Sequence, residues 1–235
     1  MGLLFLVSIS AIWFGTNNAA REIVVENAIY KRERMYNLNI LTYLFSKIIV
    51  LSLFALVQTV IFTSIIYFYF NGDEVELTNF LHTSVWFFAL SFVSILFGLF
   101  LSAFAKTSDQ VVSIIPIALI PQIMLAGILS KISTMPVEIL SYFTVSRWGT
   151  EGFSNIQKNV STTMQGIDEN GLQVNTERIM NTNSFIIEQF HDKYSNKSIF
   201  GDATGTMGMD IIALSIIAIL CLSLTVYFLK RKDTI

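Results

Sequence analysis

The sequence predicts an all-α membrane protein, and three observations predict it: composition, long uncharged apolar segments and the placement of basic residues. Hydrophobic residues make up 53% of the 235 residues and charged residues 14%, with a mean hydropathy of +0.61. Soluble domains carry about 25% charged residues. One small core could not hide so much apolar surface, so a lipid bilayer is the solvent that this composition fits.

About five membrane helices are expected. Ile48–Phe70 and Val85–Ala105 contain no charged residue and are long enough to cross a bilayer. Val111–Ser130 is a third candidate in spite of its two prolines, because membrane helices tolerate proline where neighbouring groups satisfy the freed carbonyls. Asp210–Leu229 is the last span.

The N-terminal segment Met1–Phe14 is apolar but shorter than the roughly 20 residues that a spanning helix needs. It lacks the basic start and the small-residue cleavage site of a signal peptide. We interpret it as a membrane helix whose beginning is missing. Two alternatives stay open, a true start at Met1 and a fragment of a longer chain.

Basic residues predict the orientation of these helices, since Lys and Arg concentrate in cytoplasmic loops. They gather in Asn17–Lys47, at Lys106 and at Lys230–Lys232, whereas Asn71–Thr78 has none. Alternation then places the first three segments in the cytoplasm. It places Asn71–Thr78 and Lys131–Met209 outside.

The chain therefore divides into three regions. Residues 1–130 hold membrane helices and a cytoplasmic amphipathic helix at residues 17–36. Residues 131–209 form an extracellular re-entrant segment, at the amphipathic stretch Pro136–Phe153, and a small polar ectodomain with a short helix near Glu177–Tyr194. Residues 210–235 are the last membrane helix and a basic cytoplasmic tail.

No enzyme signature is present. The sequence contains no phosphate-binding loop, no H-E-x-x-H and no G-x-S-x-G motif. The single cysteine, Cys221, excludes a disulfide within the chain, and two separate histidines, His82 and His191, make a metal site a poor interpretation. The net charge of −2 argues against nucleic acid as a partner. We expect no catalytic site, cofactor or metal.

Polar residues within the spans are few. Gln58 and Gln122 are the notable ones, and a hydrogen bond between helices is favoured over substrate contact for each. The cores of the three middle spans have no ionisable side chain, which argues against a carrier driven by protons or sodium. A transporter energised from elsewhere fits this pattern.

The charged stretch between the first two spans has helical spacing from Asn18 to about Tyr36, with Asn17 or Asn18 able to cap its start. Glu22 and Glu26 lie one turn apart and repel each other, a cost that basic groups on a partner protein could relieve. Two readings stay open: a helix that receives force from a partner, and a plain juxtamembrane anchor.

Two sequence patches are similar to a known family. One is Arg21–Arg34 followed by Tyr43–Lys47; the other is Gly127–Phe153, which contains Ser146–Glu151 (SRWGTE). Both resemble the membrane domain of G-subfamily (White-type) ABC exporters, a type II ABC exporter family. The resemblance covers membrane segments two to six of a six-helix permease, without the first membrane helix and the ATPase domain.

The resemblance implies roles for particular residues. Phe14 and Ile120 fall at cavity positions, and Ile128 and Leu129 at an apolar outer valve, although ordinary packing is as good a reading for these four. The residues implied in coupling to the nucleotide-binding domain are Arg21, Glu22, Glu26, Arg32, Glu33 and Arg34.

The expected function is the permease portion of an ATP-driven exporter in a bacterial plasma membrane, with a cytoplasmic C-terminus. Its implied partners are an ABC nucleotide-binding domain, fused or separate, a second permease half in a homo- or heterodimer, and the lipid bilayer. The alternative is a non-transporting scaffold or regulatory subunit that works through its ectodomain. The substrate cannot be carried over from the resemblance.

Overall fold

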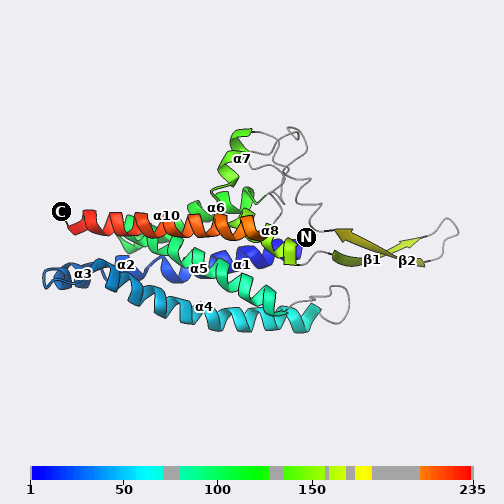
Figure 1. Cartoon of the computed structure of the whole chain (residues 1–235), viewed down its shortest axis with the longest axis horizontal. Helices are drawn as coiled ribbons and strands as arrows, with labels where there is room; N and C mark the ends of the chain where they lie inside the picture. Colours follow the sequence, from blue (N-terminus) through cyan, green and yellow to red (C-terminus); the bar gives the residue numbers. More distant parts are fainter. Residues whose placement is uncertain are drawn as a thin grey trace.

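The computed structural model describes residues 2–70, 80–126, 135–156, 159–167, 173–181 and 207–233. Its main body is an elongated bundle of helices that run along the long axis of the molecule (Figure 1). The long helices are α1 (Gly2–Ala19), α4 (Ile40–Phe70), α5 (Phe80–Phe104), α6 (Ser108–Met124) and α10 (Met207–Asp233).

Four segments of the described chain are long and apolar enough to cross a membrane: Gly2–Val25, Ile40–Tyr69, Phe80–Phe104 and Met207–Lys232. The helix α6, which contains Pro116 and Pro121, is shorter at 17 residues. The all-α membrane fold is therefore confirmed. The first helix also runs beyond the apolar run that the sequence marked, since α1 extends to Ala19.

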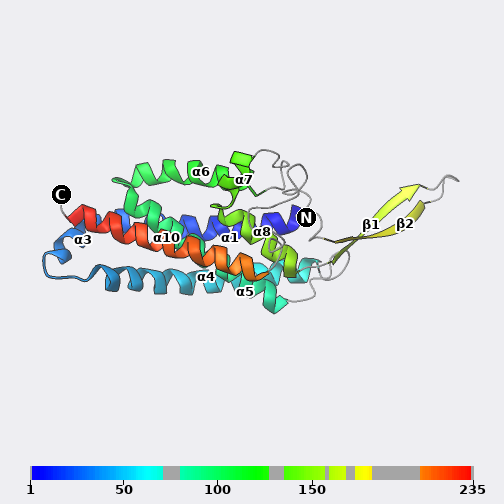
Figure 2. The ribbon, with the colours of Figure 1, turned by 45° about the horizontal axis from the view of Figure 1, so that its top comes forward.

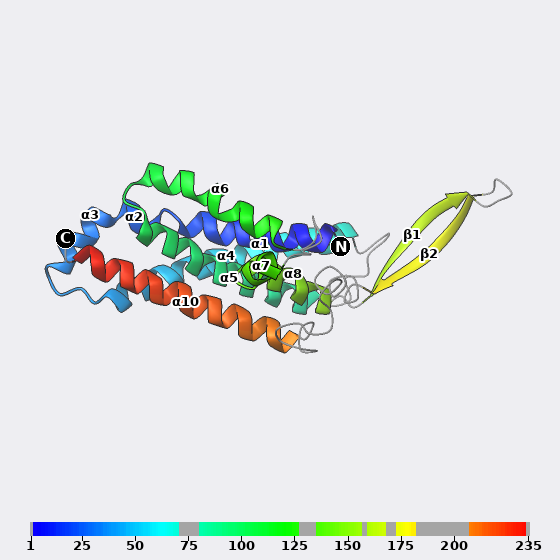
Figure 3. The same cartoon turned by 90° about the horizontal axis from the view of Figure 1, so that it is seen from above.

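The helix α5 is the centre of the bundle. It contacts α1, α2 (Glu22–Val25), α4, α6, α8 (Val145–Ile156) and α10. Viewed from above, α6 and α10 lie on opposite sides of the α1–α5 pair (Figure 3). Large parts of α4 and α10 expose apolar side chains, such as Ile49, Leu53, Ile216 and Ile219, which require lipid or a protein neighbour.

Small residues bring α1 and α5 together. A Cβ atom built on Gly15 would lie 2.4 Å from the Ser91 carbonyl oxygen, and one on Gly98 would lie 2.6 Å from the Thr16 carbonyl oxygen. Both distances are far below van der Waals contact, so the two backbones can approach only because these positions lack a side chain. Such packing is typical of helices in membranes, where the hydrophobic effect does not drive helices together.

A two-stranded antiparallel hairpin projects beyond the end of the bundle at which α1 begins (Figure 2). Its strands are β1 (Asn159–Ile167) and β2 (Gln173–Asn181), with Asn159 paired to Asn181 and Ile167 to Gln173. It is the part of the described chain that departs from an all-helical structure.

The short helix predicted near Glu177–Tyr194 is wrong in its first residues, because Glu177–Asn181 belong to β2. The turn-prone sequence at Asp168–Gly171 separates two runs rich in β-branched residues, and such runs favour paired strands over a helix. The remainder of the predicted helix lies outside the described residues.

Gly15→Ala should destabilise the protein, because the new methyl group meets backbone that cannot move aside. Overpacking of this kind costs about 1–3 kcal/mol. We expect a lower Tm and a smaller folded fraction in detergent, measured by thermal unfolding and size-exclusion chromatography. Gly98→Ala should behave alike.

Gly2→Ala is the matched control on the same helix, and Gly208→Ala on α10 is a second one. A Cβ atom at either position meets nothing within 4 Å, so both variants should keep the Tm of the parent protein. Equal losses at Gly2 and Gly15 would contradict the close-packing explanation.

Candidate functional site

The connector between α1 and α4 consists of α2 (Glu22–Val25), α3 (Asn27–Arg34) and the turn that follows. The continuous helix predicted over residues 17–36 is therefore interrupted, once at Ala20–Arg21 and once at Glu26. Neither Asn17 nor Asn18 caps it, because both lie inside α1.

Asn18 instead joins α1 to α4. Its Nδ2 donates a hydrogen bond of 2.9 Å to Oε1 of Gln58. The interhelical hydrogen bond that the sequence predicts for Gln58 is confirmed.

A serine of α5 fastens the start of α2. The backbone N–H groups of Ile23 and Val24 both donate to Oγ of Ser102, at 3.0 Å each. The first N–H groups of a helix need such acceptors, and the residue before α2, Arg21, provides no side-chain cap. The central helix of the bundle therefore supplies the cap that the local sequence lacks.

A lysine of α4 holds the other side of the connector. Nζ of Lys47 lies 3.1 Å from Oε2 of Glu22 and 2.6 Å from Oε1 of Glu26. The Tyr43 hydroxyl, one turn before Lys47, donates to Oε2 of Glu26 at 3.3 Å. The ring of Tyr43 packs on the buried Tyr30 of α3, with the centroids 5.0 Å apart.

This arrangement revises the reading of the two glutamates. The sequence suggested that their mutual repulsion needs basic groups on a partner protein, but Lys47 of the same chain supplies the positive charge. Each carboxylate side chain still keeps 38% of its surface exposed. Glu22 and Glu26 thus bind Lys47 within the chain and remain partly exposed at the surface.

The turn from α3 into α4 is closed by its own hydrogen bonds. Asn37 adopts a left-handed backbone with φ 67°, and the N–H of Leu38 donates to the Glu33 carbonyl at 3.4 Å, which is the pattern of a Schellman cap. The Arg34 guanidinium donates to the Leu38 carbonyl. Asn39 then caps α4 by accepting from the N–H of Leu41 at 3.0 Å.

The structure thus divides the six residues predicted for coupling into two groups. Glu22, Glu26 and Arg34 bind groups within the chain. Arg21, Arg32 and Glu33 are exposed. Beside them the connector exposes the apolar side chains of Val25 at the end of α2 and Ile29 in α3.

Three basic segments meet at this end of the bundle. Lys232, near the end of α10, donates from Nζ to the Ala105 carbonyl at 2.9 Å, which joins the C-terminal segment to the α5–α6 loop. Figure 1 shows the C-terminal end of α10 beside α3, at the end opposite the hairpin. The segments predicted to share one side of the membrane therefore lie together.

The SRWGTE stretch lies in α8 and is buried from Ser146 to Glu151. Trp86 of α5 donates from Nε1 to the Gly149 carbonyl at 3.0 Å, and a Cβ atom on Gly152 would lie 2.1 Å from the Trp86 ring. Ser146 donates to the Gln122 carbonyl of α6. This stretch therefore anchors α8 against α5 and α6 at the hairpin end of the bundle.

The predicted cavity and valve residues are only partly placed. Phe14 packs edge-on against Phe62 of α4, with the ring centroids 5.6 Å apart, so it fills an interface between helices. Ile120 on α6 is 54% exposed. The valve pair Ile128 and Leu129 lies outside the described residues.

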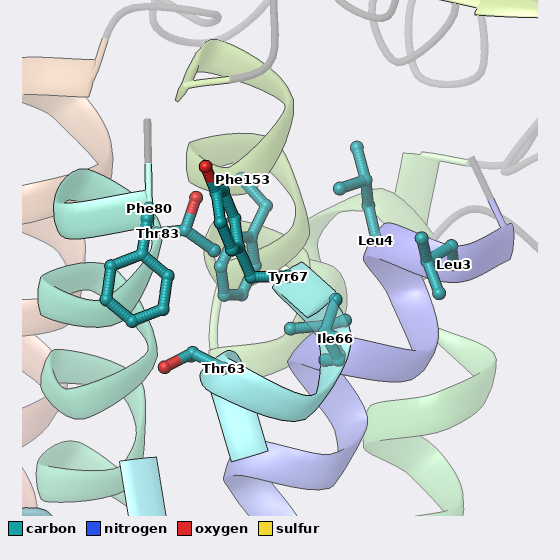
Figure 4. Close-up of a pocket in the computed structure, with 9 residues that line it drawn as sticks. Leu3, Leu4, Thr63, Ile66, Tyr67, Phe80, Thr83 and Phe153 are labelled. Carbon is teal, nitrogen blue, oxygen red and sulfur yellow. The ribbon is translucent and has the colours of Figure 1, made fainter. Parts of the chain in front are cut away.

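A narrow apolar crevice opens between α1, α4, α5 and α8 (Figure 4). Its lining residues are Leu3, Leu4, Val7, Thr63, Ile66, Tyr67, Phe80, Thr83 and Phe153. The space is about 10 Å³, which is room for at most about one water molecule. It is too small for a transported substrate within this single chain.

The described residues also contain no group of three or more His, Cys, Asp or Glu side chains that could hold a metal ion.

The fold defines a multi-pass helical membrane protein. Its bundle of helices is apolar, and the end of the bundle that carries the connector is polar. The chain belongs to the ABC-2 type transporter family, whose membrane-domain profile matches residues 1–158. The similarity to an ABC permease seen in the sequence patches is thereby confirmed.

A curated relative is the ABC transporter ATP-binding/permease protein Rv1747 of Mycobacterium tuberculosis, 29% identical over 156 residues. The match covers 63% of this chain and 18% of that protein. The chain therefore spans less than a fifth of the length of the relative that it matches.

Sequence reasoning missed Ser102 and Lys47. The role of Lys47 could have been predicted. It lies one turn from Tyr43, it is the basic residue closest to the start of the next span, and Glu22 and Glu26 need a positive charge nearby. Ser102 gave no signal, since a serine in an apolar helix is ordinary and its partners lie 78 and 79 residues away.

Ser102→Ala should lower the Tm, because two backbone N–H groups of α2 then lose their acceptor. An unsatisfied buried donor costs about 1–3 kcal/mol. Thermal unfolding measures the loss, and slow hydrogen exchange at Ile23 and Val24 should become faster.

Ser94→Ala is the matched control. Ser94 lies on the same helix and is equally buried, and its hydroxyl has no hydrogen-bond partner among the described residues. Ser94→Ala should leave the exchange rates of Ile23 and Val24 unchanged. Equal acceleration in the two variants would show that Ser102 does not hold α2.

Proposed function

We propose that the chain is the permease portion of an ATP-driven ABC exporter and that its α2–α3 connector receives force from a nucleotide-binding domain. The observation that carries the proposal is the double fastening of the connector, to α5 through Ser102 and to α4 through Lys47. Membership of the ABC-2 type transporter family supports the transport role.

The fastening suggests how force would travel. A displacement of α3 reaches α4 through the Glu22–Lys47–Glu26 cluster and the Tyr30–Tyr43 contact, and reaches α5 through the cap on α2. These contacts are short and partly buried, so the connector cannot swing freely about its ends. The exposed side chains of Arg21, Arg32 and Glu33 then form the surface that meets the nucleotide-binding domain.

The relative's printed name combines ATP binding and permease, which supports a nucleotide-binding domain as the partner of this chain, fused or separate. ATP hydrolysis belongs to that domain, and this chain contributes no catalytic residue. The exposed apolar faces of α4 and α10 support a second permease half, and the substrate path lies between the two halves. The membrane is a bacterial plasma membrane, with the connector and the C-terminus in the cytoplasm.

Arg32→Glu should uncouple the assembly, because it reverses a charge on the exposed contact surface without touching the internal fastening. We expect the permease-dependent stimulation of ATP hydrolysis to fall severalfold while the Tm is unchanged. The assay uses the complete assembly with its nucleotide-binding domain in lipid nanodiscs. Full stimulation in Arg32→Glu would contradict the coupling role of this surface.

Glu26→Lys and Lys47→Glu test the internal fastening. Each single change places like charges side by side, and a partly exposed pair of this kind contributes roughly 1 kcal/mol. We expect each single variant to lose stimulation of ATP hydrolysis, and the double variant, with the charges exchanged, to regain much of it. Arg32→Glu is the comparison, because no second change within the chain should rescue it.

A further inference from the structure

Three ionisable side chains are buried where α8 meets α10, at the hairpin end of the bundle. Arg147 is 2% exposed, Glu151 3% and Asp210 0%. Both α8 residues interact electrostatically with Asp210, which lies in the first turn of α10. Fully ionised, the three groups sum to one negative charge. In a medium of low dielectric constant, such an uncompensated charge is costly.

Among the described residues, the hydrogen bonding of the Asp210 carboxyl group is incomplete. Its Oδ2 accepts a hydrogen bond of 2.8 Å from Nδ2 of Asn155 on α8. Its Oδ1 is buried and has no hydrogen-bond partner in the described part of the chain. An ionised carboxylate can accept about four hydrogen bonds, and Asp210 receives one from the described residues.

Arg147 also contacts the segment that precedes α8. Its guanidinium donates to the Ser141 hydroxyl and stacks over the Tyr142 ring, 4.0 Å from the ring centroid. These contacts direct it to α7 (Met135–Ser141) and the turn that follows. Arg147 thus attracts Asp210 electrostatically while its guanidinium also contacts the α7 segment.

Three effects favour an ionised Asp210: the hydrogen bond from Asn155, the attraction of Arg147 and the helix dipole at the start of α10. Two oppose it: complete burial and the negative charge of Glu151. Burial has the larger effect. The free energy that a helix dipole contributes is small, whereas the free energy of desolvating a carboxylate is large. The neutral acid carries no net charge, so leaving its oxygen without a partner costs far less.

We propose that Asp210 is a proton-binding site: at neutral pH it holds a proton from the solvent on Oδ1, with Glu151 ionised beside it. The proton cancels the excess charge between α8 and α10 and keeps the two helices together. Loss of the proton would set two buried carboxylates against each other and loosen this contact. The proposal does not depend on coupling to ATP.

Asp210→Asn tests the site, since asparagine has the shape of the neutral acid and cannot lose the proton. Thermal unfolding of the complete assembly in nanodiscs is measured from about pH 6 to about pH 9. In the unfolded chain the carboxyl is ionised over this range. The native protein therefore binds one more proton than the unfolded one, and rising pH favours unfolding by about tenfold per pH unit in the equilibrium constant until Asp210 ionises.

We expect Asp210→Asn to match the wild-type Tm near neutral pH and to exceed it increasingly as the pH rises. Asp109→Asn is the matched control, because Asp109 is an exposed aspartate in the first turn of α6. It should show no such divergence. A constant loss of Tm in Asp210→Asn at every pH would overturn the proposal and indicate an ionised, paired Asp210.

Infrared spectroscopy of the wild-type protein gives a readout that does not depend on a variant folding. With carbon-13 in the aspartate carboxyls, a protonated carboxyl band that shifts with the label should be present at neutral pH and vanish at high pH. Its absence at neutral pH overturns the proposal. A rise in wild-type Tm when NaCl or KCl replaces choline chloride would also overturn it, because a metal cation would then occupy the site.

Discussion

The close approach of α1 and α5 is the constraint on which the rest of the structure depends. Gly15 and Gly98 remove the side chains that would hold the two backbones apart, and Ser91, Ser94, Thr16 and Ala19 line the same interface with small groups. In a bilayer this contact is stabilised by van der Waals packing and not by the exclusion of water. The pair then forms a rigid core against which α4, α8 and α10 pack.

The connector can be fastened because this core places α5 under it. Ser102 lies in the last turn of α5, and it reaches the first N–H groups of α2 only because α1 has run alongside α5 to Ala19. A wider spacing between α1 and α5 would carry α2 out of hydrogen-bonding range. The hydrogen bonds of Ser102 therefore depend on the close packing that Gly15 and Gly98 allow.

The sequence predicted the long helices well, because an uncharged apolar run of about 20 residues has few alternatives in lipid. The Gln58 hydrogen bond followed from the same logic, since a polar side chain in a span needs a partner. The connector was predicted as helical but not as broken, because its breaks depend on groups of α4 and α5 far away in the sequence. The sequence predicts Glu22 and Glu26 as a contact surface for a partner protein. In the structure they form ion pairs with Lys47 of the same chain.

The β-hairpin and the buried charges show a different limit. Strand pairing between β1 and β2 depends on a register that periodicity does not fix, so the sequence predicts a helix beginning in the second half of β2, at Glu177. Asp210 stands at the start of an apolar run and Glu151 near the end of an amphipathic stretch, and charged residues in both kinds of place ordinarily face water. Their burial arises from the way α8 folds back between α5, α6 and α10, which no local pattern records.

The helix α5 links the two ends of the molecule. Trp86 binds the Gly149 carbonyl at the hairpin end, and Ser102 caps α2 at the other end. The two residues are 102 − 86 = 16 positions apart, which is about 24 Å along a helix.

Every residue between them lies in one uninterrupted helix without proline, so α5 has no built-in hinge. Ser102 and Trp86 therefore join α2 and α8 to one continuous helix. Gly149 and Gly152 bring α8 so close to Leu90 and Trp86 that sliding is blocked there by side-chain contact. The connector and the SRWGTE segment, which are separate patches in the sequence, are thus both hydrogen-bonded to the same helix.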